Sequence, residues 1–145
     1  MKAKPNILII DDSESDTMLM EEAIKDTSIA NNVYIVNDAH DALSFLNQEG
    51  QYQSSPRPNL MILDLKMPDM DGHEFLERVK TDDEFNDIPI IVLSTSSDPV
   101  DIKKCYKLHA NCYIEKPVNF LRFRKVISVI NDFWLGITHL PPEGG

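Results

Sequence analysis

Short apolar runs recur along the chain and alternate with segments of helical period. Three of them, Asn6–Ile10, Leu60–Leu63 and 88–93, consist almost entirely of apolar residues. Shorter runs at 33–36 and 112–114 are rich in β-branched and aromatic residues. Continuous apolar runs of this length are typical of strands that are covered on both faces by helices. We therefore predict a parallel sheet of five strands.

Five segments with the apolar spacing of helices accompany these runs, at 15–26, 40–48, 73–80, 99–108 and 119–134. Alternation of strand and helix implies parallel strands joined by right-handed crossovers. Five such units in 145 residues predict a flavodoxin-like, doubly wound α/β domain with strand order 2-1-3-4-5 and five flanking helices. We expect one domain over residues 1–134 and a C-terminal tail over 135–145.

Composition excludes several classes of function. The 24 acidic and 14 basic residues give a formal net charge of −10, which repels the phosphates of nucleic acids. No apolar run approaches the roughly 18 residues that a membrane helix needs, and the N-terminus does not resemble a signal peptide. The two cysteines are too few for a disulfide framework and are not clustered as in a zinc site. We expect a cytoplasmic protein that binds neither nucleic acid nor membrane.

Polar residues follow the predicted strands. Asp11 and Asp12 come after the first run, Asp64 after the third, Ser94 after the fourth, and Lys116 shortly after the last. Each residue alone is more simply explained as a helix cap or a turn residue. In open α/β sheets, however, sites lie outside the carboxyl ends of the strands. We therefore expect the five side chains to meet in one cleft.

The chemistry of this set favours phosphoryl transfer. Three clustered carboxylates repel one another unless a cation neutralises them, and oxygen ligands suit Mg²⁺. With the cation bound, Asp64 would stay ionised and could attack phosphorus as a nucleophile, which gives an acyl phosphate. Lys116 and the Ser94 hydroxyl would then stabilise the phosphoryl oxygens.

At these residues the chain resembles the receiver domain of two-component response regulators, over residues 6–132. The matching segments are IDD at 10–12, LDLKMPDMDG at 63–72, LST at 93–95 and EKP at 115–117. The resemblance implies that Asp64 is the phosphoacceptor. It also implies that Asp12 and Asp64 bind Mg²⁺ directly, Asp11 mainly through water, and Lys66 through its backbone carbonyl.

The resemblance also implies a conformational switch. Tyr113 matches the aromatic switch position of the family, which turns inward as the hydroxyl residue, here Ser94, moves toward the phosphate. Thr95 is bulkier than the alanine often found beside that hydroxyl residue, so it could limit the movement of the ring. The bond between Lys116 and Pro117 is usually cis in the family, and we expect it to be cis here.

The C-terminal part narrows the resemblance to the single-domain regulators that partner bacterial phytochrome kinases. The residues that carry it are LHANCYI at 108–114, FWL at 133–135 and LPP at 140–142. This resemblance implies a sensor histidine kinase, specifically a phytochrome, as the phosphoryl donor. A sensor kinase of another kind remains the alternative, and relay to a histidine phosphotransfer protein is a further option for output.

The last predicted helix carries more apolar residues than one core-facing stripe requires. Its expected seam consists of Phe120, Phe123, Ile127, Ile130 and Trp134, and further apolar residues widen it. We expect a symmetric homodimer through this helix and the tail. The competing interpretation is a deep core helix with the tail folded over it.

Three other functions compete with phosphoryl signalling. A haloacid dehalogenase-type phosphatase needs a second acid two residues after its nucleophile, where this chain has Lys66. A flavodoxin-like cofactor domain needs a phosphate loop after its first strand, where Asp11 and Asp12 would repel phosphate. A pseudo-receiver that only binds a partner would not need every hallmark position filled. We therefore expect a signalling domain rather than an enzyme with external substrates.

Overall fold

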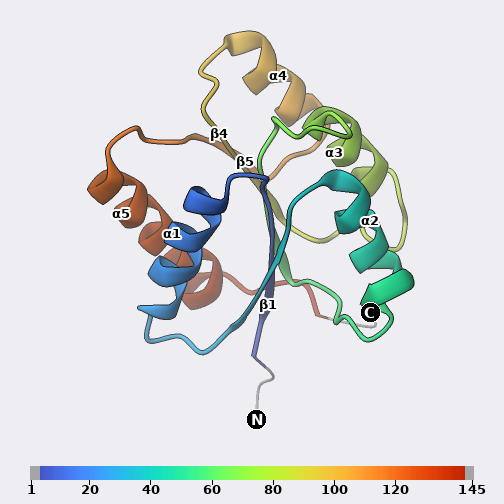
Figure 1. Cartoon of the computed structure of the whole chain (residues 1–145), viewed down its shortest axis with the longest axis horizontal. Coiled ribbons are helices and arrows are strands. Elements are labelled where there is room, and N and C mark those ends of the chain that lie inside the picture. Colours follow the sequence, from blue (N-terminus) through green and yellow to red (C-terminus); the bar gives the residue numbers. More distant parts are fainter. Residues whose placement is uncertain (1–3, 143–145) are drawn as a thin grey trace.

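Five parallel strands form the central sheet of the protein, whose computed structural model describes residues 4–142. The strand order is β2-β1-β3-β4-β5, as predicted. The strands are β1 (Asn6–Ile10), β2 (Asn32–Val36), β3 (Leu60–Leu63), β4 (Ile90–Ser94) and β5 (Cys112–Glu115). Figure 1 shows the sheet between two layers of helices.

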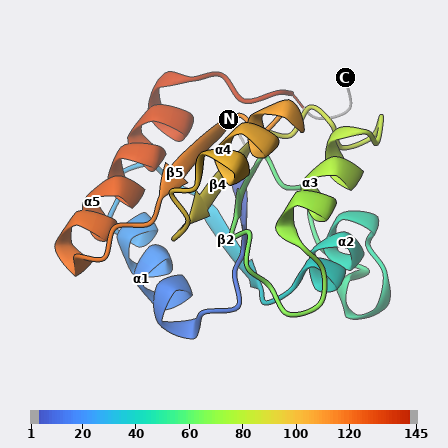
Figure 2. The same ribbon diagram turned by 90° about the horizontal axis from the view of Figure 1, so that it is seen from above.

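Five α-helices cover the two faces of the sheet. They are α1 (Glu14–Lys25), α2 (Ala39–Asn47), α3 (Gly72–Lys80), α4 (Pro99–Lys107) and α5 (Phe120–Asn131), and a short 3-10 turn, η1 (Gly50–Tyr52), follows α2. Helices α1 and α5 lie together on one face, and α2, α3 and α4 lie on the other (Figures 1 and 2). The doubly wound arrangement is therefore confirmed.

Burial on both faces explains the continuous apolar runs. In β1, Ile7 and Ile9 pack against the α1 and α5 layer, whereas Leu8 and Ile10 pack against the α2, α3 and α4 layer. All four side chains are fully buried. An alternating polar pattern would have placed polar groups in one of these cores. Each unpaired group would have cost about 1–3 kcal/mol.

Polar side chains begin each helix close to the end of a strand. The side chains of Ser13, Asp38, Asp71, Asp98 and Asn119 each accept a hydrogen bond from a backbone N–H of the first turn. Such caps satisfy donors that a helix leaves free at its N-terminus. They also fix the loops that leave the carboxyl edge of the sheet, where the candidate site lies.

The last helix differs from its prediction. Helix α5 ends at Asn131, and a π-helical turn, η2 (Asp132–Ile137), continues into the segment that we expected to be tail. Within the predicted seam only Phe123, Ile127 and Ile130 are buried, whereas Phe120 is 59% exposed. Phe120 and Leu121, the first two residues of α5, are exposed and do not belong to the core.

The tail lies against the amino edge of the sheet. Trp134 and Leu135 pack on the α1 and α5 core, and residues 138–142 line a pocket together with Lys4, Pro5, Asn6 and Asn59. Residues 143–145 of the predicted tail lie outside the described residues. Between residues 4 and 142, no helix is long and apolar enough to cross a membrane.

Candidate functional site

The predicted site residues meet at the carboxyl edge of the sheet. Ile10 pairs with Leu63 in register, so Asp11 and Asp64 leave adjacent strands at the same level. Lys116 is joined to the end of β4 because its backbone N–H donates to the Ser94 carbonyl at 2.6 Å. Four strand ends therefore bring the carboxylates, the hydroxyl and the lysine to one edge of the sheet.

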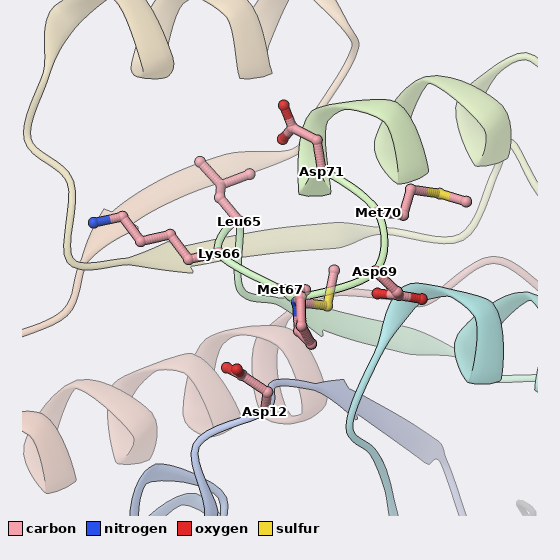
Figure 3. Close-up of a pocket in the computed structure, with 8 residues that line it drawn as sticks. Asp12, Leu65, Lys66, Met67, Asp69, Met70 and Asp71 are labelled. Carbon is pink, nitrogen blue, oxygen red and sulfur yellow. The ribbon is translucent and has the colours of Figure 1, made fainter.

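Three carboxylates form a candidate cation site. One oxygen each from Asp11, Asp12 and Asp64 lies within 4.8 Å of the others. Asp11 and Asp64 are buried, whereas Asp12 is exposed to solvent. Figure 3 shows Asp12 on one side of a pocket and the loop 65–71 on the other. An all-oxygen set with access to water fits a hard divalent cation such as Mg²⁺.

The position of Lys66 is compatible with the role that the resemblance gives to its carbonyl. Its backbone N–H approaches Asp64 Oδ1 at 3.4 Å, so its main chain lies beside the carboxylate. Its side chain extends away from Asp12 in Figure 3. The charged tail is therefore not needed to hold a cation, and the ligating role of the carbonyl remains a prediction.

Lys116 is the cation that the carboxylates share. Its Nζ donates to Asp11 Oδ2 at 2.7 Å and to Asp16 Oδ2 at 2.9 Å, and it lies 3.5 Å from Asp64 Oδ2. Burial alone would lower the pKa of this amine, but the hydrogen bonds to Asp11 and Asp16 and the charge of Asp64 raise its pKa above the usual value. Lys116 is therefore firmly protonated.

Asp64 is held in a different balance. Burial raises the pKa of its carboxyl to about 6, Lys116 opposes that rise, and the charge of Asp11 reinforces it. A divalent cation beside the same carboxylate would favour its charged form. The site thus combines a carboxylate whose charge depends on its surroundings with a lysine that keeps its positive charge.

Ser94 and Tyr113 are connected through the loop after β4. The buried Ser94 accepts a hydrogen bond from the Ser96 N–H at 3.2 Å, and the Tyr113 hydroxyl donates to the Ser96 carbonyl at 2.7 Å. Tyr113 is half-buried, and Thr95 is exposed beside this loop. Ser94 and Tyr113 therefore both form hydrogen bonds with the backbone of Ser96.

The prediction of a cis bond before Pro117 is wrong. None of the peptide bonds between described residues is cis, so Lys116 and Pro117 are joined by a trans bond. The lysine side chain is long enough to reach Asp11 and Asp64 from this backbone. The site therefore forms without the expected isomer.

Sequence reasoning missed two parts of the site. Asp16 contacts Lys116 from the first turn of α1, where acids are common because they favour the helix N-terminus. Asp69 accepts hydrogen bonds from the backbone N–H groups of Ala39 and His40 and from the His40 ring, which tethers the loop after Asp64 to α2. Neither contact has a local signal, because the partners lie far apart in the sequence.

Comparison with known proteins agrees with this geometry. The family profile described as "Response regulator receiver domain" matches residues 7–128. The chain is 40% identical to response regulator Rcp1 of Synechocystis sp. over 135 residues, which cover 93% of this chain and 92% of Rcp1. It is also 32% identical to the probable methanogenesis regulatory protein FilR2 of Methanothrix harundinacea, over 93% of this chain and 86% of that protein.

Two solved structures have nearly the same fold. The Mn²⁺-bound form of Rcp1 superposes with a TM-score of 0.92 at 39% identity, over 95% of this chain and 99% of that one. The phosphorylated cyanobacterial phytochrome response regulator RcpA superposes with a TM-score of 0.93 at 38% identity, over 97% of this chain and 100% of that one.

Proposed function

Because the chain belongs to the response regulator receiver domain family of two-component signalling, we propose that Asp64 is its phosphoacceptor. In the proposed reaction, an oxygen of the Asp64 carboxylate forms a bond to phosphorus while the bond from phosphorus to the donor atom breaks. The observation that carries the proposal is the contact of Lys116 with both Asp11 and Asp64. A lysine held there can stabilise the charge of the transferred group.

We propose Mg²⁺ as the cation of this site, with Asp11, Asp12, Asp64 and the Lys66 carbonyl as its surroundings. The support is the approach of three carboxylate oxygens to one another and the Mn²⁺-bound structure of Rcp1. When bound, Mg²⁺ would neutralise oxygens of the phosphoryl group. A related metal ion in a relative favours a divalent cation, and oxygen ligation favours Mg²⁺ in this chain.

Ser94 and Tyr113 would respond to the phosphoryl group. The Ser94 hydroxyl would move to donate a hydrogen bond to one phosphoryl oxygen. This movement would disturb the hydrogen bond that the hydroxyl now accepts from the Ser96 N–H. Because the Ser96 carbonyl accepts from Tyr113, a shift of this segment would reach the aromatic ring. We therefore propose Ser94 and Tyr113 as the switch that converts phosphorylation into a change of surface.

The central experiment is phosphorylation by a small donor. Purified protein is incubated with Mg²⁺ and acetyl phosphate, and its intact mass is measured. We expect one added phosphoryl group in the wild type and in Asp83→Asn, which changes an exposed aspartate away from the site, and none in Asp64→Asn. Folded protein that never gains this mass in saturating Mg²⁺ would refute the proposal.

We propose a phytochrome sensor histidine kinase as the phosphoryl donor, and a cytoplasmic location goes with that partner. The support is the likeness to RcpA, which is a phytochrome response regulator. The alternative is a sensor kinase of another kind, and the likeness to FilR2 favours keeping it. Relay to a histidine phosphotransfer protein is a further proposed output.

Transfer rates distinguish the kinase partners. Radiolabelled phosphate is followed from autophosphorylated kinases to this chain, with Asp64→Asn as the blank. A phytochrome kinase should transfer at least tenfold faster than a kinase with an unrelated sensor. Equal or reversed rates would favour the alternative donor.

We propose a homodimer through α5 and the tail. Exposed apolar side chains on α5 and η2 support it: Phe120, Leu121, Val129 and Phe133. A groove beside them is lined by Ile114, Val126 and Ile130 with Arg122 and Lys125 at its margin. Exposed apolar surface of this kind is typical of contact sites, and a two-fold contact would cover it with its own copy.

Sedimentation tests the dimer. Leu121→Glu and Val129→Glu should each shift a micromolar sample toward monomer, because they place a charge in the contact. Met18→Glu, an equally exposed apolar residue on α1, is the matched control and should leave the assembly unchanged. A wild type that is monomeric with and without a stable phosphate mimic would exclude this dimer.

A further inference from the structure

Three carboxylates surround the Lys116 amine. An ammonium group has three N–H donors and no acceptor. Two donate to Asp11 and Asp16 at 2.7 and 2.9 Å, and Asp64 lies at 3.5 Å from the same nitrogen. A phosphoryl group on Asp64 can therefore take the third donor directly, but it must displace Asp11 or Asp16 to take a second one.

The three carboxylates differ in how readily they can leave. The side chain of Asp11 is 2% exposed and that of Asp64 is 9% exposed, whereas that of Asp16 is 30% exposed. Asp64 also carries the phosphoryl group in the proposed reaction, and Asp11 belongs to the proposed cation site. Asp16 can turn toward water without leaving a charge buried, so displacing it costs least.

We propose that Asp16 is a positioning residue that competes with the phosphoryl group for Lys116. The inference rests on the proposed function and concerns the same site. Asp16 holds the amine from the side of α1, and a phosphoryl group on Asp64 gains a second donor of Lys116 only as Asp16 releases it. Asp16 thereby lowers the affinity of the site for the phosphoryl group.

The side chain of Asp16 is well placed for this role. Its backbone N–H is fixed by the Ser13 cap of α1, at 3.3 Å from the Ser13 hydroxyl. Its carboxylate accepts a hydrogen bond from Lys116, which lies 100 residues away in the sequence. Helix α1 therefore presents a competing anion from a rigid support, and its contact with Lys116, the residue after β5, changes when the amine moves.

Binding of a phosphoryl mimic tests the competition. Fluoroberyllate is titrated calorimetrically into the full chain at saturating Mg²⁺, with folding of each variant verified by circular dichroism. We expect Asp16→Asn to tighten binding by about three- to fivefold, the upper part of the range of a partly exposed ion pair. Glu14→Gln removes an exposed charge from the same helical turn and should change binding less than twofold.

The dependence on Lys116 separates competition from simple repulsion. In a Lys116→Met background, Asp16→Asn should change the affinity for fluoroberyllate less than twofold. Equal tightening in both backgrounds, or equal tightening by Glu14→Gln, would overturn the inference. Unchanged affinity in Asp16→Asn would also overturn it while leaving the proposed function intact, whereas wild type that binds no fluoroberyllate would count against the proposed function itself.

Discussion

Gly72 lies where the loop after Asp64 returns to its own beginning. A Cβ at this position would stand 2.6 Å from the Leu65 Cα and 3.0 Å from its carbonyl oxygen, and both atoms belong to the backbone. We predict that Gly72→Ala lowers the free energy of unfolding by about 2–3 kcal/mol, because the clash outweighs the better helix propensity of alanine. Urea unfolding of the metal-free protein measures this change.

Gly136 provides the control for Gly72. A Cβ there would meet the Ile29 Cδ1 at 3.1 Å, which is the end of a flexible side chain. Gly136→Ala should therefore cost less than about 1 kcal/mol. Similar losses for the two variants would mean that backbone crowding near Asp64 is not what requires Gly72.

The contribution of Asp69 to the stability of the fold depends on pH. Burial opposes ionisation, but hydrogen bonds from the His40 backbone and ring and from the Ala39 N–H lower the pKa of Asp69 to about 2. A carboxyl whose folded pKa is depressed stabilises the fold above its unfolded pKa and loses that contribution as pH falls through the folded value. The contribution should be complete above roughly pH 5, mostly lost by about pH 2 and absent near pH 1.

We predict that Asp69→Asn lowers the free energy of unfolding by about 1 kcal/mol at pH 7, since solvent screens part of this interaction. Unfolding curves at a series of pH values should show the difference from wild type shrinking between pH 4 and pH 2. Asp83→Asn, at an exposed position after α3, should follow the wild type throughout. A difference that persists unchanged to pH 2 would contradict the role of the Asp69 charge.

Most of the site could be predicted because its residues directly follow the predicted strands. Asp11, Asp64, Ser94 and Lys116 follow apolar runs, and parallel strands must bring their carboxyl ends to one edge. Asp16 follows no run, and its contact depends on the distance between α1 and β5, which no local pattern encodes. The isomer before Pro117 was also beyond prediction, because it depends on the local path of the chain rather than on residue types.

The loop between β4 and α4 behaves as a connected element. The Ser96 hydroxyl donates to Asp101 Oδ2 at 2.7 Å, and the Ser96 carbonyl accepts from Tyr113 at 2.7 Å. The first turn of α4 and the aromatic residue of β5 thus hold one residue from two sides. Movement of this residue must change both elements together.

A double-mutant cycle measures that connection. We predict that Asp101→Asn and Ser96→Ala each lower the free energy of unfolding by about 1 kcal/mol, and that the double variant loses less than their sum. The coupling arises because both changes remove the same charge-assisted hydrogen bond. Strict additivity would show that Asp101 does not hold the loop.

Element types were easier to predict than element ends. The five helices were expected from their apolar spacing, but α5 gives way to a π-helical turn at Asp132 rather than ending at 134. The excess of apolar residues in this helix was read correctly as more than a core requires, since Leu121 and Val129 are largely exposed. Which of them face the core depends on how α5 packs against the sheet and α1, and the apolar spacing alone does not show this.

At the scale of the whole molecule, one sheet edge gathers negative charge in a chain of net charge −10. The fold brings Asp11, Asp12 and Asp64 together, and Lys116 compensates only part of their repulsion. A cation that binds the folded site, and not the unfolded chain, must stabilise the fold by mass action. At a concentration 100 times its dissociation constant, the gain is about 2.7 kcal/mol.

We predict that saturating Mg²⁺ raises the thermal midpoint of the wild type and of Asp83→Asn by several degrees and leaves that of Asp12→Ala nearly unchanged. Asp12 suits this test because its side chain is exposed. Its substitution therefore removes a proposed ligand of the cation without opening a cavity. In metal-free buffer Asp12→Ala should equal or exceed the stability of the wild type, since one repelling charge is gone. Differential scanning calorimetry with and without Mg²⁺ gives both comparisons, and an equal Mg²⁺ shift in Asp12→Ala would place the cation elsewhere.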